Sequence, residues 1–266
     1  MALVSLFLTN SIVAQSVPSN QIITIEDLSS YLKDEVKTNF KNKVISTSEL
    51  AYYFREKFSE RYFYDWKNFE NRFQSYKTLY PEAEIVHTER ALDHMFKYNG
   101  STQWKLPFNY LFGEPVNAYA LRHLARQHKM LDIAFYYNYK NQDAEYLNYF
   151  KNQLKSLNTA FVANEFETIE DGNGVYEAFR SGYRVLNWLQ IHNMFLGQEN
   201  YSDEDQLITI ATLLQHASHL YKTNKEFHAG NHQTRGLSAL AMTSILLRDF
   251  EGTEIWYSHA MKLLEE

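Results

Sequence analysis

The sequence predicts an all-α fold, and three observations carry that prediction. The chain has 266 residues, with 20 Tyr and 18 Phe against only 9 Gly and 4 Pro, a balance that favours long regular elements over a loop-rich scaffold. Apolar residues recur at helical spacing nearly throughout. All prolines lie in the first half of the chain, the last being Pro115. Nothing forbids helix beyond that point, and no strand pattern of useful length follows it.

Two helices are predicted within the first hundred residues. Ser46 and Glu49 have the spacing of a capping box, and the helix that they open carries an apolar side. That side consists of Leu50, Tyr53, Phe54 and Phe58. A second helix is predicted from Glu89 to Phe96, after the break at Pro81. Turn-forming and aromatic residues between positions 100 and 115 predict an irregular loop.

Six further helices are predicted after this loop. Their ranges are 117–138, 142–159, 175–196, 203–222, 231–248 and 253–266. Turn-forming residues separate them, and Ser202 with Asp205 provides a capping box for the helix at 203. Because successive long helices with short connections pack antiparallel, the array is expected to be a stack of helical hairpins. No repeat of fixed period is evident, which disfavours a tetratricopeptide-type solenoid.

The two ends of the chain suggest processing and continuation. Residues 1–14 hold a short apolar run with small residues before Gln15, as in a signal peptide, although no Lys or Arg precedes Lys33. The run is too short to span a bilayer. We therefore expect a periplasmic or secreted protein with a helical domain over residues 15–266; a buried N-terminal helix is the alternative. The last helix reaches Glu266 with an apolar stripe and no stop signal, so more protein is expected to follow.

Charge and composition exclude several classes of site. A net charge of −6 argues against non-specific nucleic-acid binding, although a locally basic cleft can still hold an acidic polysaccharide. The chain has no cysteine. Four histidines lie close in sequence: His216, His219, His228 and His232. The predicted helix start at position 231 separates the last two, so the four are not expected to converge on a metal ion. Asp171 to Gly174 resembles the start of a calcium loop, but position 182 is glycine where the loop needs glutamate. No nucleotide-binding motif is present, and no cofactor is identified.

A polar cluster stands at the head of an apolar helix at positions 230–232. Asn231 by itself favours a helix N-cap, a role that asparagine performs well. The start of a helix also offers backbone N–H groups and partial positive charge to an anion. On the helix at 175–196, Arg184 and Asn187 lie near Trp188 and need polar partners, which internal hydrogen bonds to neighbouring helices can supply.

Four stretches in order resemble the N-terminal helical domain of the heparinase II/III-like polysaccharide lyases, most closely the heparinase III branch. They are ERALDHMFKYNG with Leu92, His94 and Phe96; LRHLARQHKMLDIAFYY with Arg126; EAFRSGYRVLNWLQIHNMFL with Arg184, Asn187 and Trp188; and GNHQTRGLSALAMTSILLRDFEGTEIW with Asn231 and His232. Together they cover roughly residues 80–266. One departure is that the Arg-His pair of the family is Arg126-Gln127 here.

The resemblance implies an incomplete (α/α) toroid, normally continued by a β-sandwich, in an enzyme that cleaves a heparan-sulfate-like polysaccharide by β-elimination. Asn231 then neutralises the uronate carboxylate, with His232 beside it. The resemblance also implies substrate contacts from His94, Arg126, Arg184 and Asn187. The family's acid and base, a Tyr and a His, come later in the chain, so this chain alone is expected to be inactive and to fold at best partly independently.

Two alternatives stay open from the sequence. One is a non-catalytic helical glycan-binding or scaffold protein, because one fold serves many functions. The other is a lyase for alginate or another uronate. Basic residues lining the cleft favour a sulfated substrate, but the sequence does not say which of six candidates face it: Arg122, Arg126, Lys129, Arg180, Arg184 and Arg235.

Overall fold

Nearly all of the regular structure in the computed structural model is helical. The structure describes residues 16–42, 44–98, 110–111, 114–115, 118–163 and 174–266. Its elements are α1 (Ile25–Leu28), η1 (Ser29–Tyr31), α2 (Asp34–Lys37), α3 (Thr47–Arg61), η2 (Trp66–Asn68), α4 (Phe69–Leu79), α5 (Ala83–Lys97), β1 (Tyr110–Leu111), β2 (Glu114–Pro115), α6 (Ala118–Arg126), α7 (Met130–Tyr139), α8 (Ala144–Val162), α9 (Ala178–Phe195), α10 (Asp203–Thr223), α11 (Asn231–Leu246) and α12 (Thr253–Glu265). The predicted all-α class is confirmed; the strands form one short antiparallel pair.

Most predicted helices agree with the structure within a few residues. The two capping boxes, at Ser46 with Glu49 and at Ser202 with Asp205, are both present. The predicted helix at 89–96 is part of the longer α5, and the first half holds short elements that the sequence analysis did not predict. The predicted signal peptide, most of the predicted loop at 100–115 and most of the turn at Asp171 lie outside the described residues.

The single helix predicted over 117–138 is wrong, because α6 and α7 are separate. Gln127 interrupts them with a φ of 54°, a left-handed conformation that no continuous helix contains. Its backbone N–H donates to the carbonyl oxygens of His123 and Leu124, and its side-chain amide donates again to Leu124. Gln127 is fully buried, so the break lies within the packed core. The apolar periodicity of the sequence continues across the break and therefore does not reveal it.

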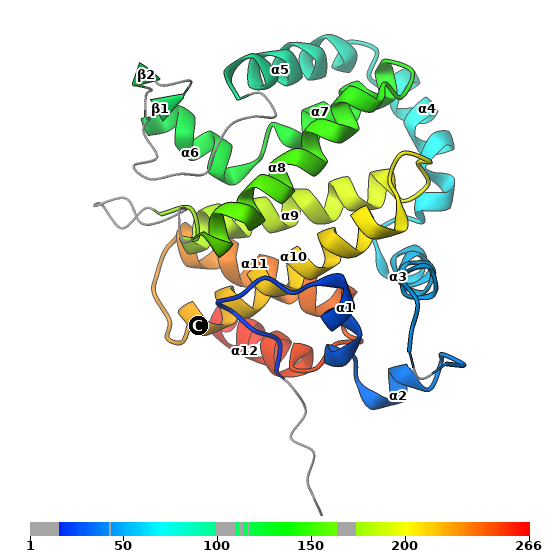
Figure 1. Cartoon of the computed structure of the whole chain (residues 1–266). Helices are drawn as coiled ribbons and strands as arrows, with labels where there is room; N and C mark the ends of the chain where they lie inside the picture. The colour runs from blue at the N-terminus through cyan, green and yellow to red at the C-terminus, as the bar shows by residue number, and fades with distance from the viewer. Residues whose placement is uncertain (1–15, 43, 99–109, 112–113, 116–117, 164–173) are drawn as a thin grey trace, which may run out of the picture.

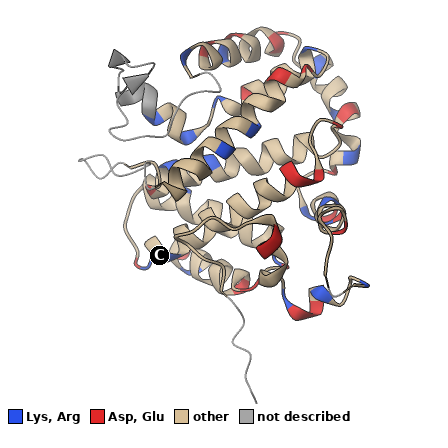
Figure 2. Ribbon diagram, viewed as in Figure 1, with Lys and Arg blue, Asp and Glu red and all other residues tan. Residues whose placement is uncertain are grey.

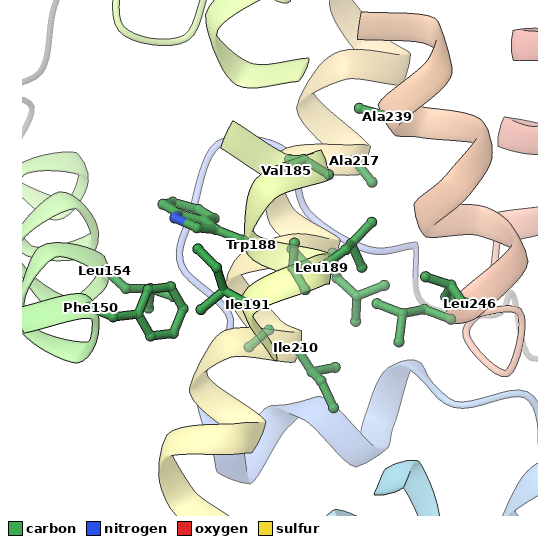
Figure 3. Packing of buried hydrophobic residues seen from close by; sticks show 14 of the residues in the cluster. Phe150, Leu154, Val185, Trp188, Leu189, Ile191, Ile210, Ala217, Ala239 and Leu246 are labelled. Carbon is green, nitrogen blue, oxygen red and sulfur yellow. The ribbon is translucent and has the colours of Figure 1, made fainter. Parts of the chain in front are cut away.

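The helix α9 lies at the centre of the packing. It contacts α6 and α7 on one side and α10 and α11 on the other, and α12 covers α11 (Figure 1). The short N-terminal helix α1 lies against α10. Figure 3 shows part of the core around α9, where side chains of α8, α9, α10 and α11 meet. The labelled members are Phe150, Leu154, Val185, Trp188, Leu189, Ile191, Ile210, Ala217, Ala239 and Leu246.

A glycine lets α9 and α11 approach backbone to backbone. A Cβ atom on Gly182 would come within 2.6 Å of the carbonyl oxygen of Arg235, closer than real Cβ contacts allow. The opposing backbone cannot rotate away as a flexible side chain can. Any larger residue at this position would push the two helices apart, and with them the polar residues at their starts.

Several histidines are enclosed in the helical core. Burial lowers the pKa of His94 and of His192 to about 3, and burial together with the nearby Arg184 charge lowers the pKa of His216 well below its usual value. All three are at most 1% exposed. They are therefore neutral in the folded protein at pH values where an unfolded chain would already protonate them.

We expect the free energy of unfolding to fall as the pH drops from 7 to 5. The unfolded histidines bind protons near pH 6.5, whereas folded His94 and His192 do not until about pH 3, so acid favours the unfolded state. Each such histidine lowers the free energy of unfolding by about 1.4 kcal/mol for each pH unit below about 6.5. Urea unfolding curves at both pH values measure the change. Equal midpoints would show that these side chains are not held neutral.

Candidate functional site

The start of α11 has no side-chain cap. Gly230 occupies the N-cap position with a φ of 140°, a conformation that favours glycine. Asn231 is the first helical residue and is exposed, and its side-chain amide makes no hydrogen bond to another described residue. The N-cap interpretation of Asn231 is therefore wrong, because a residue already in the helix does not place its side chain over the next N–H groups. The amide is available to a ligand.

Hydrogen bonds from a residue in the first turn of α11 fix the loop that precedes this helix. Gln233, which is buried, accepts the backbone N–H of His228 at 2.7 Å and donates to the carbonyl oxygen of Glu226 at 2.6 Å. These bonds tie the incoming chain to the first turn of α11. Asn231 and His232 project from a backbone that is fixed on both sides of Gly230.

His232 lies beside the start of α9. Its Nδ1 is 3.0 Å from Oε1 of Glu177, and its ring stacks on Phe179 with centroids 4.6 Å apart and planes 14° from parallel. The side chain of His232 is still 55% exposed. Glu177 thus engages one ring edge of His232 and Phe179 covers one face, while about half of the side chain remains exposed.

Arg126 reaches the same place from the end of α6. Its guanidinium lies 4.9 Å from the centroid of the Phe179 ring, a cation–π contact. Asn187 donates its side-chain amide to the carbonyl oxygen of Arg126 at 3.3 Å and so anchors the end of α6 on α9. Three helix ends, from α6, α9 and α11, therefore place Arg126, Phe179 and His232 together.

Arg184 does not reach this surface. It is fully buried, and its guanidinium donates to the carbonyl oxygens of Ala125 at 2.6 Å and Val175 at 3.0 Å. It also donates to Nε2 of His216, 3.2 Å from Nε. A guanidinium without exposed surface cannot meet a polysaccharide, so direct substrate contact is not compatible with this conformation. Arg184 instead joins the end of α6 and the segment before α9 to α10.

His94 lies apart from this cluster of helix starts. It belongs to α5, is 1% exposed, and its ring packs against Tyr98 and Tyr149 at centroid distances of 5.0 and 5.8 Å. A side chain enclosed in this way has no surface for a substrate. The structure gives His94 a place in the core between α5 and α8.

The sequence analysis missed three residues of the site. Glu177 and Phe179 contact His232. Tyr183, one turn further along α9, accepts a hydrogen bond from Arg235 of α11 at its hydroxyl group. The Arg235 guanidinium lies 4.3 Å from the Tyr183 ring centroid. These contacts arise because the starts of α9 and α11 pack together. No local sequence pattern predicts that packing. Figure 2 shows Lys and Arg on α6 and on α8.

The described residues offer few sites of other kinds. Within the described ranges, no three His, Asp or Glu side chains are grouped so that they could hold a metal ion. The searched helices are each too short or too polar to cross a membrane. One pocket of about 510 Å³ lies between η2 and the turn after α9, at Trp66 and Gln198. Another, of similar size, lies between the segment 16–21 and α10.

Comparison with protein families gives one match. Residues 24–266 match the family model described as Heparinase II/III N-terminus. Comparisons with curated proteins and with solved structures gave no match. The matched range contains every residue of the cluster at the starts of α9 and α11.

Proposed function

The chain belongs to the heparinase II/III N-terminal family, and from this premise we propose that it is the carboxylate-binding helical domain of a polysaccharide lyase that acts by β-elimination. Family membership points to a polysaccharide lyase domain. The substrate that we propose is a uronic-acid-containing glycosaminoglycan of the heparan sulfate type, as in the heparinase III branch. The helices then form part of an (α/α) toroid, and the protein is exported to reach its substrate.

The step of the reaction that requires catalysis is removal of the proton on C5 of the uronate. This proton is weakly acidic, and its removal spreads negative charge onto the adjacent carboxylate. Hydrogen-bond donors placed at the carboxylate stabilise that charge as it develops. A base takes the proton and an acid protonates the departing O4 oxygen. In this proposal both come from elsewhere in the full-length protein.

The uncapped start of α11 carries the proposal. Side chains cap α3, α8, α9 and α10, through Ser46, Asp143, Glu177 and Ser202, whereas α4, α5, α7 and α12 lack a side-chain cap as α11 does. What sets the α11 start apart is the amide of Asn231 beside His232, close to the Arg126–Phe179 contact. At α11 no side chain caps the first turn, and Asn231 adds an amide donor there. A helix start of this kind favours a carboxylate even on a protein of net negative charge.

Neighbouring cations support an acidic ligand. Arg126 and Arg235, each half-buried and resting on an aromatic ring, lie on the helices beside Asn231. Asn187 then acts by holding the end of α6, through its bond to the carbonyl oxygen of Arg126, rather than by touching the sugar. We propose that these two cations attract a uronate toward the α11 start.

A substrate panel tests the proposal. We expect the full-length protein to release unsaturated uronate products from heparan sulfate, with slower turnover of alginate and none of a neutral glucan. Preferred turnover of alginate would change the substrate but keep the lyase. Binding of these polymers without unsaturated product would instead indicate a glycan-binding protein, and the lyase proposal would be abandoned.

A further inference from the structure

Glu177 connects the starts of α9 and α11. Its Oε1 accepts the backbone N–H of Phe179 at 3.0 Å and its Oε2 accepts that of Arg180 at 3.4 Å, so the carboxylate caps α9. The same Oε1 lies 3.0 Å from Nδ1 of His232. The side chain of Glu177 is 17% exposed. Because the α9 backbone holds the carboxylate, it is a fixed partner for the imidazole.

Phe179 restrains the same imidazole on its face. The two rings stack at a centroid distance of 4.6 Å and 14° from parallel, and the Arg126 guanidinium covers Phe179 in turn. Stacking sets the plane of the His232 ring, and the bond to Glu177 sets its rotation within that plane. An exposed histidine is thereby held in one orientation.

From this geometry we propose that Glu177 is a positioning residue that keeps the neutral His232 in the tautomer with its proton on Nδ1. An ionised carboxylate only accepts hydrogen bonds, so the nitrogen that faces it must be the donor. The lone pair is then on Nε2, at the opposite edge of the ring. His232 therefore presents an acceptor from the same first turn of α11 that carries the amide donor of Asn231.

The catalytic consequence rests on the proposed function. A uronate carries a carboxylate oxygen, which accepts from Asn231, and ring hydroxyl groups, which can donate to Nε2 of His232. A donor and an acceptor on adjacent residues orient the sugar ring better than either alone. With the proton on Nε2 instead, His232 would offer a second donor, and the hydroxyl would lose its acceptor.

The nitrogen NMR spectrum of His232 tests the tautomer without any assay of activity. In the intact chain at a pH where the ring is neutral, we expect the Nδ1–H form. In Glu177→Gln the amide can turn either its oxygen or its NH2 group toward Nδ1, with the other group toward the N–H of Arg180, so we expect a mixture of both tautomers. An Nε2–H form in the wild type would overturn the proposal.

Turnover tests the positioning role. We expect Glu177→Gln to lower kcat of the full-length protein on a uronate polymer by about ten- to a hundredfold through misplacement of His232. The matched control is Asp143→Asn, because Asp143 caps α8 through the N–H of Glu145 at 3.0 Å and has no histidine partner among the described residues. We expect the control to retain both the Nδ1–H spectrum and kcat.

The two levels of the proposal fail in different ways. An altered tautomer in Glu177→Gln with unchanged kcat would overturn the positioning role while the lyase remained. If Asn231→Ala left turnover intact, the proposed function itself would fall, and the nitrogen spectrum would still decide whether Glu177 fixes the tautomer.

Discussion

Asn231→Asp is expected to lower turnover of a uronate polymer by about 10² or more, the effect of losing one preorganised donor, without weakening the fold. The new carboxylate keeps the shape of the amide but repels the substrate carboxylate. At the first position of α11 it also meets the positive end of the helix, which stabilises such charges by about 0.3–1 kcal/mol. Activity and the free energy of unfolding thus move in opposite directions, and steady-state kinetics with urea unfolding measure both.

The matched control is Thr47→Asp. Thr47 is exposed and is the first residue of α3, so the variant adds the same charge at the same helical position away from the cluster at the α11 start. We expect its turnover to equal that of the wild type. Asn231→Asp with wild-type turnover would remove the carboxylate-binding role from Asn231.

Arg184→Met is expected to destabilise the fold by about 3–5 kcal/mol, the range for breaking a buried charged network. The change leaves two buried carbonyl oxygens, of Ala125 and Val175, and Nε2 of His216 without their donor. Burial lowers the pKa of Arg184 to about 10, so the guanidinium remains charged at neutral pH. The guanidinium also makes cation–π contacts with Tyr176 and Trp188, whose ring centroids lie 5.3 and 5.5 Å from its central carbon.

Arg248→Met provides the comparison for this variant. Arg248 is exposed near the end of α11, and we expect its loss to change the free energy of unfolding by no more than about 0.5 kcal/mol. Chemical denaturation of both variants gives the values. A loss below about 1 kcal/mol in Arg184→Met, less than one unsatisfied buried group costs, would show that this network does not join the helices.

Much of the second half of the fold could be predicted because its helices carry clear local signals. Ser202 with Asp205 and Gly252 mark boundaries that the structure reproduces at α10 and α12. The break at Gln127 could not be predicted, because a single buried residue with a left-handed backbone leaves the apolar periodicity intact. The small elements α1 and η2 are held by contacts with other helices, α1 with α10 and η2 with α3 and α9, which their short sequences do not predict.

The candidate site was predictable only in part, and for a physical reason. Asn231, His232 and Arg126 were found through resemblance to a family, and the structure places them on neighbouring helix ends. Arg184 was expected at the substrate because it accompanies Trp188 in the motif, but burial gives it an internal role. Residue type and spacing do not tell which side of a helix faces a cleft. That distinction depends on the packing of α9 against α11.

A thermodynamic cycle on binding tests the central proposal, contact between Asn231 and a uronate carboxylate, most directly. The affinities of the wild type and of Asn231→Ala are measured for a uronate oligosaccharide and for its carboxyl-reduced counterpart, in which a neutral hydroxymethyl group replaces the carboxylate. We expect the wild type to prefer the uronate by about tenfold or more, the strength of a hydrogen bond to a charged group, and Asn231→Ala to lose that preference. An equal preference in both proteins would contradict the contact.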